Sequence, residues 1–126
     1  MAKIYLLIGA LNGFIAVALG AFGAHGLKQR LSADLLAVYQ TGVQYHFYHT
    51  FALLIAAALM LYWPQNNLLR WSALLFCVGI VIFSGSLYVL SLTGIRWLGA
   101  VTPLGGVAFL AGWIALAVAV WKAEIL

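Results

Sequence analysis

Two of the three histidines in this chain, His46 and His49, lie three residues apart in a sequence with only two acidic side chains. A helix turns about 100° per residue, so it would place both on one face, together with Tyr39 and Leu53. Imidazole nitrogens bind protons, hydrogen-bond partners and metal ions, which makes this face the first candidate for chemistry. The predicted polar cluster adds two residues from the first apolar segment and consists of Asn12, His25, Tyr39, His46 and His49.

A metal or haem site is one possible use of these histidines. His25 would supply the third protein ligand that a catalytic zinc ion usually takes, if the three histidines gather at one membrane level. Asp34 is the only carboxylate near them in the sequence. The favoured interpretation is therefore a set of neutral histidines without metal or cofactor, bonded to hydroxyl groups in a helical bundle, with Tyr39, Thr50, Ser86 and Thr102 as expected partners.

The sequence lacks the residues that nucleophilic or acid–base catalysis would need. The chain has no Gly-x-Ser-x-Gly elbow, and serines in membrane helices usually bond their own backbone or a neighbouring helix. The two carboxylates, Asp34 and Glu124, stand at opposite parts of the sequence, so paired acid–base chemistry is not expected. The prediction is that the protein is not an enzyme.

The composition indicates a membrane protein. Hydrophobic residues make up 67% of the 126 residues and charged residues 6%, whereas a soluble domain has roughly 45–50% and about 25%. The net charge of +4 comes from isolated residues without a basic run, so nucleic acid is not an expected partner. The apolar excess must face membrane lipid.

Four apolar segments are long enough to cross a membrane as helices, and these helices must position the polar side chains. A bilayer core needs about 20 helical residues, and the predicted helices cover residues 4–24, 33–63, 68–92 and 98–121. Ser32 is a plausible N-cap of the second helix, whose first part, 33–41, is expected near the headgroups, with Gly42 as a bend or close-contact point. Tryptophans occur at the segment ends, as an aromatic belt requires: Trp63, Trp71, Trp97 and Trp121.

These segments predict an all-α fold. We expect one integral membrane domain, residues 1–126, with four transmembrane helices in an up-down bundle and both termini on one side. Each side of the membrane would carry three lysine or arginine residues, so the number of basic residues does not determine the orientation of the chain. The termini are expected on the cytoplasmic side of a bacterial inner membrane.

Small residues recur at helical spacing in three of the segments. Such stripes let membrane helices approach closely, and the predicted packing positions are Gly9, Gly13, Gly20, Gly79, Ser86, Gly105 and Gly112. A four-helix monomer does not obviously need this much close-packing surface. A homo-oligomer is therefore expected.

Four motifs in fixed order carry a resemblance to a known family. They are Gly20–Leu27 (Gly-Ala-Phe-Gly-Ala-His-Gly-Leu), Thr41–His46 with His49-Thr50, Ser84–Tyr88, and Thr102–Gly106 with Ala111–Trp113. Together they resemble the YgdD-like family, small bacterial inner-membrane proteins that form a domain-of-unknown-function family with relatives in eukaryotes. The resemblance covers essentially the whole chain and implies four helices in the cytoplasmic membrane. It implies no catalytic residues.

Three functional interpretations follow. The first is a non-enzymatic membrane protein that acts by association with itself, with lipid or with a larger membrane complex. The second is a small transporter or channel with a polar path at Asn12, His46 and His49, although membrane ion relays usually use further ionisable groups. The third is a metal-binding or haem-binding membrane protein.

Overall fold

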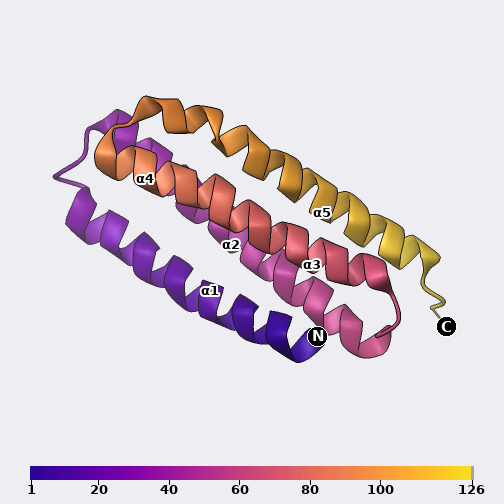
Figure 1. The fold of residues 1–126 in the computed structure, drawn as a ribbon. Coiled ribbons are helices and arrows are strands. Elements are labelled where there is room, and N and C mark those ends of the chain that lie inside the picture. The colour runs from indigo at the N-terminus through magenta and orange to yellow at the C-terminus, as the bar shows by residue number, and fades with distance from the viewer. Residues whose placement is uncertain (126) are drawn as a thin grey trace.

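The computed structural model describes residues 1–125 and forms four antiparallel helical rods joined by short connections (Figure 1). The elements in chain order are α1 (Ala2–Phe22), the π-helical turn η1 (Gly23–Leu27), α2 (Ala33–Tyr62), α3 (Asn67–Gly79), the π-helical turn η2 (Ile80–Ser84), α4 (Gly85–Thr93), the 3-10 turn η3 (Arg96–Ala100) and α5 (Thr102–Lys122). The segments 2–27, 33–62, 67–93 and 96–122 are each long and apolar enough to cross a membrane. The predicted all-α fold with four transmembrane helices is confirmed.

Local sequence signals determine where the rods begin and end. The Ser32 hydroxyl accepts a hydrogen bond from the Leu35 amide at 3.2 Å, which confirms the predicted N-cap of α2. Gly94 ends α4 with φ at 74°, a left-handed conformation that glycine adopts without strain. The fourth rod was expected to be helical from Leu98, but α5 begins at Thr102, with Pro103 in its first turn, where proline costs no hydrogen bond.

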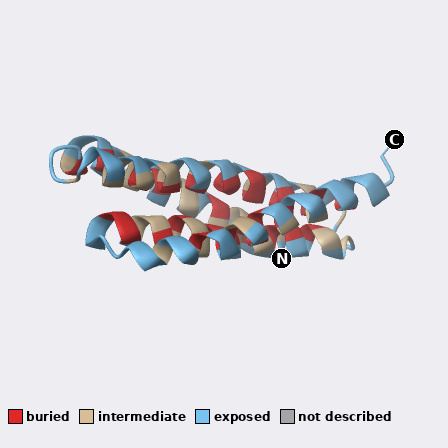
Figure 2. Cartoon of the chain, turned by 90° about the horizontal axis from the view of Figure 1, so that it is seen from above, coloured by how far each residue is buried: buried red, intermediate tan, exposed pale blue. Residues whose placement is uncertain are grey.

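α2 is the central helix of the molecule. It packs against α1 on one side and against α3 and α4 on the other, while α5 packs mainly on α3 and η2. In the most apolar window of each segment, 44% of the residues are buried in 33–62 but only 17% in 2–27, so α1 is the peripheral rod. Buried residues lie on the sides of the helices that face the interior of the bundle, and exposed residues lie on the outer sides (Figure 2). The apolar core lies mostly between α2, α3 and α5, around Leu53, Ala56, Leu69, Phe76 and Leu116.

α2 is one uninterrupted helix, so residues 33–41 do not form a separate surface helix, and their expected position near the headgroups stays a prediction. At 1.5 Å per residue its 30 residues span about 45 Å, longer than the bilayer core of about 30 Å. Gly42 is not a bend but a point of close contact, where an added Cβ would lie 3.0 Å from the Tyr88 ring. His46, Tyr48 and His49 stand near the middle of α2, and therefore well inside a helix that is long enough to cross a membrane.

The two ends of the bundle carry equal numbers of basic residues. The N-terminus, the α2–α3 connection and the C-terminal segment lie at one end (Figure 1), with Lys3, Arg70 and Lys122. Lys28, Arg30 and Arg96 lie at the other end, where Arg96 forms an exposed ion pair of 3.0 Å with Asp34. Because the counts are equal, the cytoplasmic location of the termini stays a prediction.

Candidate functional site: polar side chains at mid-membrane

Asn12, His46 and Tyr88 link α1, α2 and α4 by a chain of hydrogen bonds. The Asn12 amide nitrogen donates to the Ile8 carbonyl at 2.9 Å, so its Oδ1 is the acceptor for His46 Nε2 at 2.8 Å. The Tyr88 hydroxyl lies 2.8 Å from His46 Nδ1. With Nε2 protonated, Nδ1 is free to accept the tyrosine proton. The arrangement therefore satisfies a neutral imidazole at both nitrogens.

His49 lies three residues further along α2 and bonds toward different helices. Its Nδ1 donates to the Tyr45 carbonyl at 2.8 Å, and its Nε2 accepts from the Trp113 indole of α5 at 3.0 Å. The ring stacks on Phe109, with centroids 3.5 Å apart and planes inclined by 6°. His49 is 5% exposed, and both of its nitrogens have partners as a neutral ring. It joins α2 to α5 across an aromatic contact.

Tyr39 anchors the end of α1 to α2. Its hydroxyl donates to the Leu19 carbonyl, and its ring lies against Gly23, where an added Cβ would overlap it. The ring also lies next to Tyr88, with centroids 5.4 Å apart. Tyr39 thus touches the Asn12–His46–Tyr88 chain through a ring contact and not through a hydrogen bond.

His25 does not join the other histidines, contrary to the predicted cluster. It lies in η1 with an exposed side chain, which forms no hydrogen bond within residues 1–125. The reason is the length of α2, because about 20 Å of helix separates Ala33 from His46 at 1.5 Å per residue. His25 therefore lies near the end of the bundle, and His46 and His49 lie near its middle.

The described residues offer no evident metal-binding or nucleophilic arrangement. Within residues 1–125, no three side chains among histidine, cysteine, aspartate and glutamate are grouped closely enough to hold a metal ion. Two buried serine hydroxyls donate to carbonyl groups of neighbouring helices, Ser72 to Gly112 at 2.9 Å and Ser84 to Gly42 at 2.7 Å, and buried Ser91 donates to the Tyr88 carbonyl of its own helix. Ser72 and Ser84 are positioned to hold helices together.

The predicted hydroxyl partners of the histidines were wrong. Ser86 and Thr102 bond each other at 2.6 Å and connect α4 to the start of α5. Thr50 Oγ1 is buried without a hydrogen-bond partner in the described chain. The actual partners are Tyr88, Asn12, Trp113 and the Tyr45 carbonyl.

The small residues of α1 face α2 within the same chain. A Cβ added at Gly9 would lie 2.5 Å from the Leu54 side chain, whereas one at Gly13 would lie 3.8 Å from Thr50. Gly20 faces Val43 at 3.4 Å. This stripe therefore has its partner inside the molecule.

The small residues of α3 and α5 also pack within the chain. A Cβ at Gly79 would overlap the Phe109 ring, and one at Gly112 would lie 2.8 Å from Phe76. Gly105 is the position with the least room to adjust, because an added Cβ would meet the backbone of Phe83 in η2 and not a side chain that can move. The predicted packing glycines bring the rods of one molecule together, so they are not a spare surface.

Among residues 1–125, the outer face of α2 carries polar side chains without a partner at membrane depth. Most exposed residues of this helix recur every three or four positions and form the outer stripe of α2: Ala37, Gln40, Gln44, Tyr48, Phe51, Ile55, Ala58 and Tyr62. Ala33, Asp34, Tyr45 and Leu61 are exposed outside this stripe. Within residues 1–125, the side chains of Gln40, Gln44 and Tyr48 form no hydrogen bond, and Tyr48 is 55% exposed. Gln44 and Tyr48 lie within about 6 Å of the middle of α2. Two polar side chains thus face outward at membrane depth.

Comparisons with known proteins place the chain among small membrane proteins. A family model described as "Protein of unknown function (DUF423)" matches residues 19–106. The UPF0382 membrane protein YwdK of Bacillus subtilis is 48% identical over 120 residues, which cover 95% of this chain and 98% of the relative. No solved structure matches the chain.

Two further relatives come from other bacteria. A UPF0382 membrane protein of Haemophilus influenzae is 43% identical over 126 residues, with all of both chains covered. The UPF0382 inner membrane protein YgdD of Escherichia coli is 44% identical over 115 residues, which cover 89% of this chain and 85% of the relative. None of these names describes an enzymatic activity.

Proposed function

The chain belongs to the DUF423 family of membrane proteins, and we propose that it acts by associating with a second copy of itself, not by catalysis. It is a multi-pass protein of the bacterial inner membrane, like its relative from Escherichia coli. Its working surface in this proposal is the outer stripe of α2. A heteromeric membrane complex is the alternative that the experiment below distinguishes.

The observation that carries the proposal is that the side chains of Gln44 and Tyr48 have no hydrogen-bond partner within residues 1–125. Both side chains are exposed near the middle of a helix that crosses the membrane. Lipid tails offer no hydrogen bonds, and an amide left without partners in an apolar medium costs several kcal/mol, about 4–8 by transfer to cyclohexane. A protein neighbour at this depth would remove that cost.

A second copy fits this surface by symmetry. Copies inserted in the same orientation are related by a twofold axis perpendicular to the membrane, so each residue meets its counterpart at equal depth. A glutamine amide can both donate and accept hydrogen bonds, and so can a tyrosine hydroxyl. Gln44 and Tyr48 are therefore self-complementary across such an axis.

The interior of the molecule supports association over transport or catalysis. Asn12 and His46 bond each other, and His49 bonds Trp113 in a separate interface, so the three side chains are engaged in packing and do not form a continuous row. The small-residue stripes pack inside the chain. The outer face of α2 is where polar groups at membrane depth remain free to bind.

Replacing Gln44 with leucine tests the proposal. We expect the wild-type chain to contain dimers when single molecules are counted in lipid nanodiscs by stepwise photobleaching. Gln44→Leu and Tyr48→Phe should each weaken dimerisation by about 3-fold to 20-fold, because hydrogen bonds between membrane helices contribute about 0.6–1.7 kcal/mol.

Gln65→Leu is the matched control, since it makes the same change in the exposed α2–α3 connection. It should leave the dimer fraction unchanged. A wild-type chain that stays monomeric at high protein-to-lipid ratio would refute the proposal. Stable co-purification of a different protein that Gln44→Leu releases would replace it with the heteromeric alternative.

A further inference from the structure

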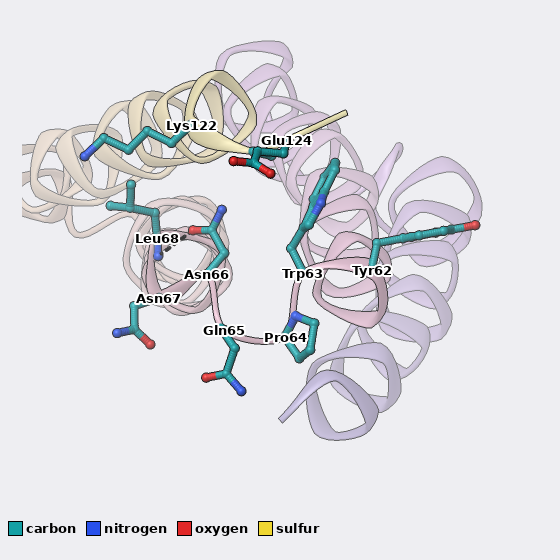
Figure 3. A pocket seen from close by; sticks show the side chains of 10 residues that line it. Tyr62, Trp63, Pro64, Gln65, Asn66, Asn67, Leu68, Lys122 and Glu124 are labelled. Carbon is teal, nitrogen blue, oxygen red and sulfur yellow. Dashed lines mark hydrogen bonds between the residues drawn. The ribbon is translucent and has the colours of Figure 1, made fainter. Parts of the chain in front are cut away.

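A second feature lies at the end of the bundle that carries both termini. A cavity of about 760 Å³ opens between the α2–α3 connection and the segment that follows α5 (Figure 3). Its lining is mixed and includes Trp63, Gln65, Asn66, Lys122 and Glu124. The cavity contains one of the two acidic side chains of the sequence.

The cavity lies at the level where lipid headgroups meet water. Exposed aromatic side chains surround this end of the bundle, as at membrane interfaces, and they include Tyr62, Trp71 and Trp121, which are 80%, 58% and 87% exposed. The cavity begins where α2 ends, at Tyr62 and Trp63. A ligand that enters here can keep its chains in the bilayer and its polar group in the cavity.

Two walls of the cavity suit a positively charged group. Figure 3 shows the Glu124 carboxylate turned toward the space between Trp63 and Asn66. A carboxylate accepts hydrogen bonds from an ammonium group, and an indole ring attracts a cation to its face. Asn66, on the other side of this space, is held in place by two hydrogen bonds. Its side chain donates to the Ala119 carbonyl at 3.1 Å and accepts from the Leu68 amide at 3.1 Å.

The rim of the cavity suits a negatively charged group. Lys122 lines the cavity, and Figure 3 shows its side chain extending away from Glu124, past Leu68, so that its flexible ammonium group can reach lipid phosphates beside the cavity. Gln65 and Asn67 have exposed amides that form no hydrogen bond within residues 1–125. The cavity therefore combines an inner site for a cation with an outer site for an anion.

We propose that this cavity binds the headgroup of a phosphatidylethanolamine molecule. That headgroup carries a primary ammonium and a phosphate a short distance apart, in the order that Glu124 and Lys122 require. An anionic headgroup without an amine, such as phosphatidylglycerol, can offer Glu124 only neutral hydroxyl groups, and its net negative charge is repelled by the carboxylate. A quaternary amine, as in phosphatidylcholine, would face the indole but cannot donate hydrogen bonds to the carboxylate.

Native mass spectrometry of the full chain in mild detergent tests the proposal. Phosphatidylethanolamine, phosphatidylglycerol and phosphatidylcholine are added separately at equal concentrations, and the lipid-bound fraction is measured. We expect phosphatidylethanolamine to bind about fivefold more tightly than the other two, since a cation–π contact and a partly exposed ion pair each contribute about 1 kcal/mol or less. Glu124→Gln should abolish this preference, and Trp63→Leu should reduce it.

Asp34→Asn is the matched control, because it removes the only other carboxylate, at the opposite end of the bundle. It should leave the preference unchanged. Equal binding of the three lipids by the wild-type chain, or an unchanged preference in Glu124→Gln, would overturn the proposal. These outcomes are independent of dimerisation through α2, because the cavity and the Gln44 face are separate surfaces.

Discussion

His46 and His49 share one face of α2, yet they bond in different directions. His46 reaches Asn12 of α1 and Tyr88 of α4, whereas His49 reaches Trp113 of α5. Each ring has one nitrogen that donates and one that accepts, which is the pattern of a neutral imidazole. The pair therefore connects α2 to three other helices without placing a charge at mid-membrane, where charges are costly.

Removing the Tyr88 hydroxyl should destabilise the folded bundle. In Tyr88→Phe the His46 Nδ1 loses its donor in a buried site, so we expect a loss of about 0.6–1.7 kcal/mol in the free energy of unfolding. Unfolding of the purified protein by SDS titration measures this change.

Tyr62→Phe is the control, because Tyr62 is 80% exposed and lies at the helix end. It should alter stability by less than about 0.5 kcal/mol. If Tyr88→Phe were as mild as Tyr62→Phe, the hydrogen bond to His46 would contribute nothing to stability.

The sequence identifies the two histidines of these hydrogen bonds but not the residues to which they bond. Helical periodicity indicates which residues share a face of α2, so His46 and His49 were predicted as polar positions in the interior. It does not indicate how neighbouring helices are rotated, so Tyr88 and Trp113 were not identified as their partners. His25 was wrongly included because the depth of His46 along α2 was underestimated.

At the scale of the helices, glycine sets how closely the rods approach. Gly105 in α5 lies against the backbone of Phe83, in the π-helical turn η2 between α3 and α4. The sequence predicts these small-residue stripes, because small residues are typical of close contacts between membrane helices. The stripes were also the reason to expect a homo-oligomer, but they meet other helices of the same chain, so they do not support that expectation.

Two adjacent glycines provide a sharp comparison. Gly105→Ala places a methyl group against the Phe83 backbone, which cannot rotate away, so we expect a loss of stability of about 1–3 kcal/mol. In Gly106→Ala the added methyl group lies 3.9 Å from the Phe83 ring, so the change should be neutral.

Thermal unfolding in detergent, followed by circular dichroism, measures both variants. Because they make the same chemical change in the same turn of helix, helix propensity affects them alike. Equal melting temperatures for the two variants would contradict the close contact between α5 and η2.

At the scale of the whole molecule, α2 is the most buried rod but still has an open face. Its buried faces contact α1, α3 and α4, and its outer stripe runs from Ala37 to Tyr62. Composition and segment lengths were enough to predict four spanning helices. The open polar face could not be predicted, because it depends on which side of α2 the other rods leave uncovered.

Cysteine cross-linking in native membranes tests the central claim, that two copies meet along the outer stripe of α2. Phe51→Cys, in a chain whose own cysteine is changed by Cys77→Ala, keeps Gln44 and Tyr48 and lies on the same stripe. Ile114→Cys is the control, since Ile114 is exposed at similar depth on α5. Mild oxidation should produce a disulfide-linked dimer from Phe51→Cys and little from Ile114→Cys. Equal cross-linking of both, or none from Phe51→Cys, would contradict association through α2.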